Sequence, residues 1–488
     1  MDTAKSTLIE RLERIVGKDG VFSRPADLLV YEYDGSVEGA VETAAPTAVT
    51  LPRTAEQVAD IVRLAREAGL PVVARGAGTG LSGGAVPQQG GIIISLTQMN
   101  RVLEIDSEDC TALVEPGVIN LELSEETQSH GFFFAPDPSS QKACTIGGNV
   151  AENSGGPHCL KYGVTTNHIL GLEVVLPDGR IIWTGGRATG TSGYDLTGAM
   201  VGSEGMLGIV TKALVRLTPL PEATLVLLAP FADIESASFA TSRVIAAGIV
   251  PAALEMMDNL TIQAVEPAYH AGYPLDAGAV LLIEIDGLTN DVLATGEEVA
   301  AICREAGATE VRLATEKAER DLLWKGRKMA LGAMGRLAPN YYLHDTVVPR
   351  SKLPDTLRRV EEISRDYALP IANVFHAGDG NLHPLMLFDR RVSGATERVL
   401  EASKEIITYC VEVGGALSGE HGIGTEKRGY MTLVYTAEDL AAMAGLKNSF
   451  DPAGMFNPEK VFPKGYMCGE VRALRMQAMA QKLGIYAF

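Results

Sequence analysis

The sequence predicts an α+β protein with two or three domains. Its 488 residues exceed the roughly 250–300 residues at which a single hydrophobic core stops growing. Strand-like and helix-like segments alternate over 46–115, a glycine-dense region follows, and from Pro219 onward glycines are fewer. This last region has the pattern of an antiparallel sheet with helices on one face, so we expect a domain boundary near residue 220.

The region before residue 220 begins with a predicted helical segment over residues 1–45. Apolar residues at helical spacing then predict a helix over 54–69, which ends at a glycine. Runs of β-branched and other apolar residues predict strands over 46–52, 70–75 and 92–96. The N-terminus lacks the basic flank and the apolar run of a signal peptide.

The region after residue 220 is expected to contain strands and amphipathic helices. Strand composition extends over 224–231 and 279–287, and helical spacing over 238–248, 292–307, 351–368 and 395–413. The tail, residues 464–488, is a predicted helix with four basic residues and one acidic residue. It is expected either to pack on its own domain or to dock on a partner or a membrane surface.

Composition excludes several classes of protein. A net charge of −19 argues against nucleic-acid binding, which needs a basic surface. The six cysteines form no C-x-x-C pair, so neither a zinc ribbon nor a cysteine-ligated iron–sulfur cluster fits within this chain. They indicate a reducing compartment, the cytoplasm. The sequence has no run of 18 apolar residues, so no transmembrane segment is expected.

A glycine-rich stretch, RGAGTGLSGGA (Arg75–Ala85), contains the spacing G-x-G-x-x-G. A nicotinamide-binding loop with this spacing would open a helix, because the pyrophosphate sits on the N-terminus of that helix. Here VPQQGG and the strand-like IIISL follow instead, which excludes that interpretation. The stretch is therefore a turn between two strands, and it either cradles phosphate with its backbone N–H groups or forms a plain glycine-rich hairpin.

A second glycine-dense region extends from Asp137 to Thr211. It contains DPSSQKACTIGGNVAENSGGPH and, further along, GSEGMLGIVT. Glycine at this density inside a folded domain indicates that the backbone packs closely against another group, often a ligand.

Three histidines fall in two short motifs, HAGDGNLHP (376–384) and SGEHGIG (418–424). His376 and His383 are separated by a D-G-N turn that returns both imidazoles to one side, and Glu420 and His421 add a carboxylate and a third ring. Two histidines and a carboxylate suit a divalent metal with open coordination positions. Because Glu420 and His421 are adjacent, one would bind the metal while the other transfers a proton. The alternative is that these histidines cap turns or bind core carbonyls.

Arg327 lies in a helix-like segment, DLLWKGRKMA, before the predicted strand PNYYLHDTVVP. Its planar guanidinium suits a substrate carboxylate. A solvated surface arginine is the alternative.

Taken together, these motifs resemble those of a known flavoprotein family. RGAGTGLSGGA, PDPSS, TIGGNVAENSGG and GSEGMLGIVT resemble the FAD-binding domain of the vanillyl-alcohol oxidase and p-cresol methylhydroxylase (PCMH) type. HAGDGNLHP, SGEHGIGTEK and DPAGMFNPEK resemble the C-terminal half of FAD-linked D-2-hydroxyacid dehydrogenases. Within that family, WKGRKMALGAMGRLAPNYYLHDTVVPR is most similar to the FAD-binding subunits of bacterial glycolate oxidases.

The resemblance implies how FAD is bound. The loop after Arg75 would hold the FAD pyrophosphate, and further segments would line the flavin. No histidine lies between residues 75 and 90, so FAD is expected to be non-covalent. The cofactor-binding residues so implied are Arg75, Gly76, Ala77, Gly78, Thr79, Gly80, Leu81, Ser82, Gly83, Pro136, Asp137, Ser139, Thr145, Gly147, Gly148, Asn149, Asn153, Gly155, Gly156, Gly205, Ile209, Val210 and Asn457.

The resemblance also implies the chemistry. His376, His383 and Glu420 would bind a divalent metal, expected to be Zn²⁺ with Mn²⁺ or Fe²⁺ as alternatives. His421 would be the general base and Arg327 the clamp on the substrate carboxylate, so that a 2-hydroxy acid becomes a 2-oxo acid. Relatives that act on dicarboxylates have a lysine just before the aspartate equivalent to Asp345, and this chain has none there. A small monocarboxylate is therefore expected, glycolate first and D-lactate next.

The implied organisation has five parts. After the helical segment 1–45 come a PCMH-type FAD-binding domain of two α+β subdomains (46–220), a substrate or cap domain (221–415), a segment that returns to the flavin (416–463) and the basic tail helix (464–488). A second flavin-domain subunit and an iron–sulfur subunit are the expected partners. The expected location is the cytoplasm, with the inner face of the membrane, reached through those partners, as the alternative. Alternatives are a stand-alone D-lactate dehydrogenase linked to a cytochrome, a quinone or an electron-transfer flavoprotein, a metal-dependent hydrolase, and a non-catalytic assembly subunit.

Overall fold

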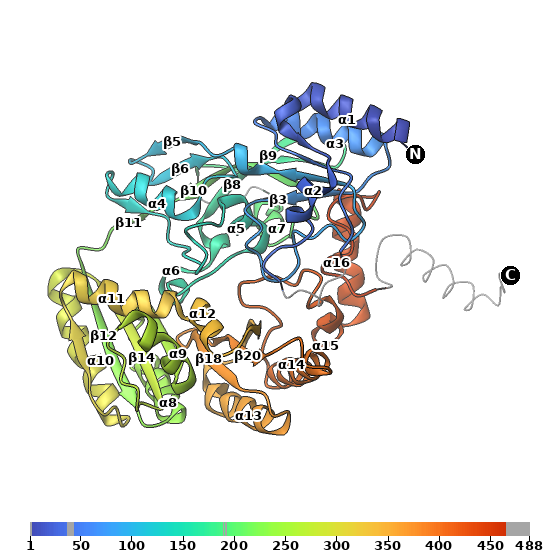
Figure 1. Ribbon diagram of the computed structural model, residues 1–488. Coiled ribbons are helices and arrows are strands. Elements are labelled where there is room, and N and C mark those ends of the chain that lie inside the picture. The colour runs from blue at the N-terminus through green and yellow to red at the C-terminus, as the bar shows by residue number, and fades with distance from the viewer. Residues whose placement is uncertain (1, 37–42, 189, 191–192, 465–488) are drawn as a thin grey trace. The chain divides into compact units, whose positions relative to one another are not determined.

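The computed structural model of the chain describes residues 2–36, 43–188, 190 and 193–464, and they form two compact units. Unit 1 contains the chain up to Ser154, the stretch Val164–Pro219 and the chain from Glu420 onward. Unit 2 contains Gly155–Gly163 and Leu220–Gly419. Both units combine helices and sheets, which confirms the predicted α+β class (Figure 1).

The first sheet of unit 1 has four short strands, in the order β1 (Val21–Phe22), β2 (Ala48–Thr50), β4 (Ile92–Ser95) and β3 (Val72–Arg75). Both β2 and β3 pair with β4 in parallel, whereas β1 is antiparallel to β2. Two parallel neighbours cannot be joined by a tight hairpin. Residues 76–91, which join β3 to β4 without a helix, therefore form a long loop, and the hairpin interpretation of the glycine-rich stretch is wrong.

The second sheet of unit 1 is antiparallel and has five strands, in the order β5 (Val102–Asp106), β6 (Thr111–Val114), β10 (Ile209–Arg216), β8 (Ile169–Val175) and β9 (Ile181–Gly185). A separate antiparallel pair joins β7 (Phe132–Phe133) to β11 (Thr218–Pro219). The strand β10 begins directly after the GSEGMLG motif, so the motif lies at one end of this sheet.

Helices surround both sheets of unit 1. The helix predicted over 54–69 is confirmed, since α3 extends over Ala55–Glu67. Thr54 caps this helix by accepting a hydrogen bond from the Gln57 N–H at 3.3 Å. Leu12 and Ile61 share one apolar cluster with strand β4. The helices are α1 (Asp2–Val16), α2 (Pro25–Leu28), α3 (Ala55–Glu67), α4 (Asn120–Gln128), α5 (Ile146–Glu152), α7 (Leu196–Met200), α15 (Met431–Val434) and α16 (Ala437–Phe450), with 3-10 turns at Lys18–Gly20, Leu29–Tyr31, Leu96–Gln98, Thr165–His168 and Arg428–Tyr430.

Unit 2 is built on one antiparallel sheet. Its strands follow the order β15 (Arg312–Ala314), β12 (Ala223–Phe231), β14 (Ala279–Gly287), β13 (Ala253–Asp258), β18 (Ile371–His376), β19 (Asn381–Leu382) and β17 (Thr346–Val347). Off this path, β20 (Pro384–Phe388) pairs with β18 and with β16 (Asn340–Leu343). The sheet brings together β13 and β18, which are more than a hundred residues apart in sequence.

Helices cover both faces of the unit 2 sheet, so the predicted single covered face is wrong. Leu225 of β12 lies against Gly296, whereas the next residue, Val226, clusters with Ile262 and Leu323. Consecutive strand residues point to opposite faces, so helices α10, α9 and α11 lie on both sides. The helices are α6 (Cys159–Tyr162), α8 (Ile234–Ala246), α9 (Asn259–Tyr269), α10 (Thr289–Glu305), α11 (Lys317–Lys328), α12 (Ala330–Ala333), α13 (Leu353–Asp366) and α14 (Ala395–Glu412), with 3-10 turns at Met334–Arg336 and Arg350–Lys352.

Two predictions concern membranes and the tail. Within the described ranges, each helix falls short of the length and hydropathy needed to cross a bilayer. The predicted tail helix over 464–488 lies outside the described residues, except for Lys464.

A buried ion pair anchors the C-terminal part of unit 1. Lys447, in the last turn of α16, donates to Asp451 Oδ2 at 2.5 Å and to the carbonyls of Met206 and Phe456 at 2.6 and 3.0 Å. Asp451 Oδ2 also accepts from the Phe456 N–H at 2.8 Å. Phe456 forms a parallel bridge with Val72, so the ion pair attaches the 451–457 segment to the edge strand β3.

Replacing Lys447 by methionine should destabilise unit 1 by about 3–5 kcal/mol, because it leaves a buried carboxylate without its cation. The measurement is urea-induced unfolding followed by circular dichroism. Lys317→Met, which breaks the exposed pair with Asp321, is the control and should leave the unfolding midpoint unchanged. Equal midpoints for the two variants would contradict this assignment.

Candidate functional site

The glycine-rich loop of unit 1 is braced from within. Arg75, the last residue of β3, is buried. A Cβ atom on Gly78 would be 2.1 Å from the Arg75 guanidinium, so the guanidinium occupies the space of a side chain at position 78. Gly78 has φ +71°, a left-handed conformation that glycine adopts without strain. The same guanidinium lies 5.6 Å from the ring centroid of Tyr31, and burial lowers its pKa. Arg75 therefore shapes the loop in which it was predicted to bind FAD.

The second glycine-rich segment lies against this loop. Thr145 caps α5 by accepting from the Gly148 N–H at 3.2 Å, and its Oγ1 would be 2.3 Å from a Cβ on Gly76. Asn149 is buried and accepts from the Asn120 amide at 2.9 Å. The predicted cofactor residues of the two glycine motifs in unit 1 thus share one region.

Asn457 joins further predicted cofactor residues to the same region. Its amide donates to the carbonyls of Gly84 at 2.9 Å and Glu204 at 2.7 Å, and it lies 4.0 Å from the Cβ position of Gly205. Ile209 and Val210 begin the adjoining strand β10. Four segments far apart in the sequence therefore meet in unit 1.

The remaining predicted cofactor residues are placed less uniformly. The carbonyl of Pro136 accepts from Asn120, whereas Ser139 is exposed. Asn153 ends α5 in the left-handed conformation with φ +55°. Gly155 and Gly156 belong to the short segment that groups with unit 2, which the sequence did not predict.

The glycine region of unit 1 fits FAD. Among the described residues, Ser82 Oγ and Asn457 Oδ1 are buried without a hydrogen-bond partner. Buried polar atoms are almost always paired, so each needs a partner that the chain does not provide. A hydroxyl donor and an amide acceptor beside glycine backbone suit the phosphate and ring-edge groups of a dinucleotide.

A buried carboxylate in unit 1 holds the loop that follows His421. Glu204 accepts the N–H groups of Ile423 and Gly424, both at 2.7 Å. Gly424 lies against the Ser82 carbonyl, which a Cβ would approach to 2.2 Å, so this loop contacts the glycine-rich loop. The neighbouring Gly205 was predicted to lie near the cofactor, whereas no role was predicted for Glu204.

Glu204 shares its buried surroundings with other charged groups. Burial raises the pKa of Glu152 well above its ordinary range, and the charge of Glu204 raises it further. Burial also lowers the pKa of Lys460 to about 8, although nearby acids including Asp34 oppose that shift. Burial also raises the pKa of Glu204, although the N–H groups of Ile423 and Gly424 oppose that shift. These two bonds make Glu204 the more readily ionised carboxyl of the pair.

In unit 2, the strand register brings the two histidines of HAGDGNLHP together. His376 ends β18, Gly380 with φ +83° makes the turn, and His383 follows β19. The two rings lie 5.1 Å apart, centroid to centroid, and nearly perpendicular. Both side chains are buried.

Each histidine is oriented by a hydrogen bond at Nδ1. His376 Nδ1 donates to Glu255 Oε1 at 2.8 Å, and His383 Nδ1 donates to the His344 carbonyl at 3.1 Å. Because a carboxylate and a carbonyl only accept, the proton of each neutral ring lies on Nδ1. Both Nε2 atoms then present lone pairs, the form in which histidine binds metals.

Asp345 holds the segment that leads to the third ligand. It is buried directly before β17 and accepts from Ser418 Oγ at 2.5 Å and from the Gly419 N–H at 3.0 Å. Ala416 adds a bridge to Val347. Gly419 is followed directly by Glu420, so chain connectivity keeps the backbone of Glu420 close to Asp345.

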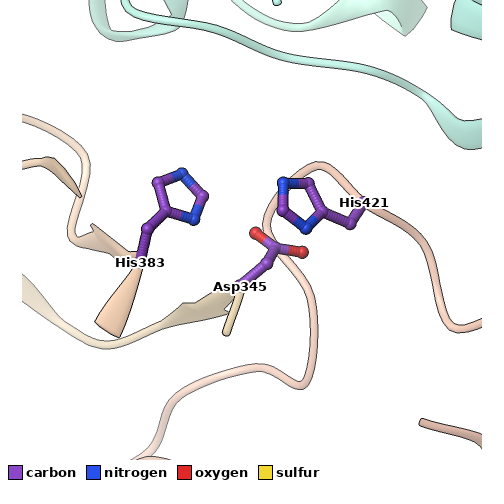
Figure 2. A group of neighbouring side chains, drawn as sticks. All are labelled: Asp345, His383 and His421. Carbon is purple, nitrogen blue, oxygen red and sulfur yellow. The ribbon is translucent and has the colours of Figure 1, made fainter. Parts of the chain in front are cut away.

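The candidate ligands lie within reach of one ion. Ligand atoms of His376, His383 and Glu420 are all within 4.8 Å of one another. Those of Asp345, His383 and His421 form a second such group, and Figure 2 shows the three side chains pointing toward one another. Two imidazoles with a carboxylate suit Zn²⁺, Mn²⁺ or Fe²⁺, so the donor set fits a divalent metal. Asp345 was not among the predicted ligands.

Arg327 is buried, so its interpretation as a solvated surface residue is wrong. It lies in the last turn of α11 and donates to Glu255 Oε2 from Nε at 2.7 Å and from Nη2 at 2.5 Å. Arg327 and His376 therefore share one carboxylate. Sequence reasoning missed Glu255, because a lone acidic residue in an apolar strand gives no motif.

Two family models match the chain. The FAD binding domain matches residues 46–185, and the C-terminal domain of FAD linked oxidases matches residues 220–461. The glycolate oxidase subunit GlcD of Escherichia coli (strain K12) is 45% identical over 96% of this chain and 94% of its own length. The chain belongs to the FAD-linked oxidase family.

Other relatives of this FAD-linked oxidase include GlcD of Bacillus subtilis, 43% identical over 93% of this chain and 96% of its own length. A D-lactate dehydrogenase of Archaeoglobus fulgidus is 35% identical over 93% of this chain and 99% of its own length. Crystalline p-cresol methylhydroxylase superposes with a TM-score of 0.80 at 18% identity, covering 94% of this chain and 97% of its own. The predicted PCMH-type fold is confirmed, the protein is an FAD-linked oxidoreductase, and the hydrolase interpretation is wrong.

Glu152 should make the stability of unit 1 depend on pH. Its pKa is raised in the folded protein, so its contribution to stability is complete below about pH 4.5 and is lost as the pH rises toward the folded value. Glu152→Gln keeps the neutral form at every pH. Thermal unfolding from pH 5 to 9 should show this variant gaining stability relative to wild type as the pH rises.

The control for this series is Glu125→Gln, at an exposed carboxylate, which should follow the wild-type pH profile. A Glu152→Gln variant that loses stability relative to wild type toward pH 9 would show that Glu152 is ionised in the folded protein.

Proposed function

We propose that this FAD-linked oxidase oxidises a small 2-hydroxy monocarboxylate to the 2-oxo acid, with glycolate preferred and D-lactate next. One observation carries the reaction class: two buried histidines present their Nε2 atoms beside a carboxylate, as a metal that binds a substrate hydroxyl requires. The names of the relatives, a glycolate oxidase subunit and a D-lactate dehydrogenase, support hydroxy acids as the substrates.

Each residue of the proposed site has a separate role in the reaction. When bound, FAD supplies the acceptor for the hydride of the α-carbon, and a divalent ion supplies a Lewis acid that lowers the hydroxyl pKa. His376, His383 and Glu420 would hold the ion. His421 accepts the hydroxyl proton on a ring nitrogen, a role typically worth about 10²- to 10⁴-fold in rate.

Arg327 is the proposed clamp on the substrate carboxylate. Its bonds to Glu255 use Nε and Nη2. We assign the donors of Nη1 to the substrate, because a guanidinium offers five N–H groups in a planar fork. The pairing with Glu255 holds that plane in one orientation before substrate arrives.

The surroundings of Leu343 support a monocarboxylate. Leu343 is half-buried at the end of β16 and packs against the apolar cluster of unit 2. A second substrate carboxylate at this position would lose its hydration without gaining a cation. Glycolate and D-lactate carry no such group.

A second candidate is a stand-alone D-lactate dehydrogenase. The Archaeoglobus fulgidus relative, which covers nearly all of both chains, carries that name and favours it. The two candidates differ in whether the isolated chain turns over D-lactate with an artificial acceptor.

The reduced flavin must pass on its electrons. The relatives at 45% and 43% identity are named as subunits, which supports the proposal that this chain acts as one subunit of a larger enzyme. We propose a second flavin-domain subunit and an iron–sulfur subunit as the partners. The location in the cytoplasm, and at the inner face of the membrane through these partners, stays a prediction.

Anaerobic addition of glycolate to the purified protein should bleach the flavin absorption near 450 nm, and D-lactate should bleach it more slowly. His421→Asn should retain the flavin spectrum but bleach about 10²- to 10⁴-fold more slowly, because the proton acceptor is lost. The measurement is stopped-flow absorbance with each acid.

Faster bleaching with D-lactate would favour the stand-alone dehydrogenase. A flavin that neither acid bleaches would contradict the proposed substrate class.

A further inference from the structure

We propose that Glu255 is a positioning residue that sets, with one buried carboxylate, both the metal-binding ring of His376 and the substrate-binding plane of Arg327. This inference rests on the proposed function, in which those two residues bind metal and substrate. Glu255 would contact neither; it acts through the groups that do.

The register of the sheet places Glu255 for this role. Glu255 on β13 and His376 on β18 are direct partners in an antiparallel pair. The Glu255 side chain is fully buried. Residues directly opposite in such a pair have side chains on the same face and in contact, so the histidine reaches the carboxylate without any loop rearrangement.

The carboxylate of Glu255 is shared by both partners. His376 Nδ1 donates to Oε1 at 2.8 Å and to Oε2 at 3.0 Å, and Arg327 donates to Oε2 from Nε at 2.7 Å and from Nη2 at 2.5 Å. Any neighbouring carboxylate would compensate the charge of a buried arginine. The additional bond to His376 is what links the proposed metal ligand to the proposed substrate clamp.

The bond to His376 has a chemical consequence for metal binding. A carboxylate can only accept, so it holds the proton on Nδ1 and leaves Nε2 as the lone-pair donor. Carboxylates in this position also make the ring a stronger ligand. The other histidine, His383, is oriented by a backbone carbonyl, so the Glu255 side chain is the one of these two anchors that substitution can change.

Glutamine at position 255 would move the imidazole proton of His376 from one ring nitrogen to the other. Arg327 only donates, so the glutamine carbonyl takes the Oε2 position and the NH₂ group takes the Oε1 position, which is the closer of the two to His376 Nδ1. The NH₂ group then donates to Nδ1. The imidazole proton would move to Nε2, the atom that must be free for a metal. Glu255→Gln should therefore weaken metal binding although its shape is unchanged.

The neighbouring strand offers a matched control. Glu284 on β14 also accepts from α11, through Trp324 Nε1 at 2.5 Å, and from His158 Nε2 at 3.2 Å. Glu284 lies opposite Ala253, so its side chain is on the same face of the sheet as that of Glu255. Glu284→Gln thus removes a carboxylate bond to the same helix without touching His376 or Arg327.

The test compares full-length, flavin-loaded wild type, Glu255→Gln and Glu284→Gln. The Zn²⁺ dissociation constant is measured by competition with a chromogenic chelator, and KM and kcat are measured for glycolate. We expect Glu255→Gln to weaken Zn²⁺ binding about 10- to 100-fold and to raise KM, whereas Glu284→Gln stays within threefold of wild type.

Glu255→Asp keeps the charge beside Arg327 but withdraws the carboxylate by one methylene, so it provides a second variant if the glutamine protein does not fold. It should show the same losses at smaller size. A folded Glu255→Gln or Glu255→Asp protein with wild-type Zn²⁺ affinity and KM would overturn the role of Glu255 alone. Wild-type protein that binds no Zn²⁺, Mn²⁺ or Fe²⁺ would overturn the proposed metal site, and the role of Glu255 with it.

Discussion

The candidate catalytic motif depends on buried carboxylates that hold its backbone on either side of the point where the chain passes from unit 2 to unit 1. Asp345 holds Ser418 and Gly419 within unit 2. Glu204 holds Ile423 and Gly424 within unit 1. Only Glu420, His421 and Gly422 lie between these anchors. A buried carboxylate is costly unless its bonds are satisfied, so each anchor persists only while its N–H or O–H partners stay in place. That mutual requirement restricts the motif to few conformations, which is what proton transfer and metal binding need.

The same principle extends to the proposed ligands. His376 and Arg327 are held by Glu255, and His383 is held by the carbonyl of His344, just after β16. His376, His383 and Arg327 are thus each oriented by a group that is not proposed to meet substrate or metal. Because these side chains are already ordered in the folded protein, less conformational entropy is lost when substrate binds and reacts.

Much of this molecule could be predicted from sequence because its motifs are local. The glycine-rich stretch after β3, the helix at 54–69 and the two histidine motifs are short, and the turns that shape them are encoded within a few residues. The absence of a helix after the glycine stretch excluded the nicotinamide-binding fold, in agreement with the FAD-binding family match. By contrast, Glu204, Glu255 and Asp345 could not be assigned roles. Each acts on a partner more than seventy residues away, through strand register or a loop crossing, and no local pattern marks an acid whose partner is so distant. For the same reason the second covered face of the unit 2 sheet was missed, although the nearly continuous burial of β12 is what a strand covered on both faces shows.

Flavin reduction in metal-stripped protein tests the proposed site. We propose that a divalent ion held by His376, His383 and Glu420 is needed for the chemistry, while FAD is held independently by the glycine segments of unit 1. Chelator-treated protein should keep its flavin spectrum, fail to bleach when glycolate is added anaerobically, and recover bleaching when Zn²⁺, Mn²⁺ or Fe²⁺ is returned. Metal-free protein that glycolate bleaches as fast as the untreated protein would contradict the account.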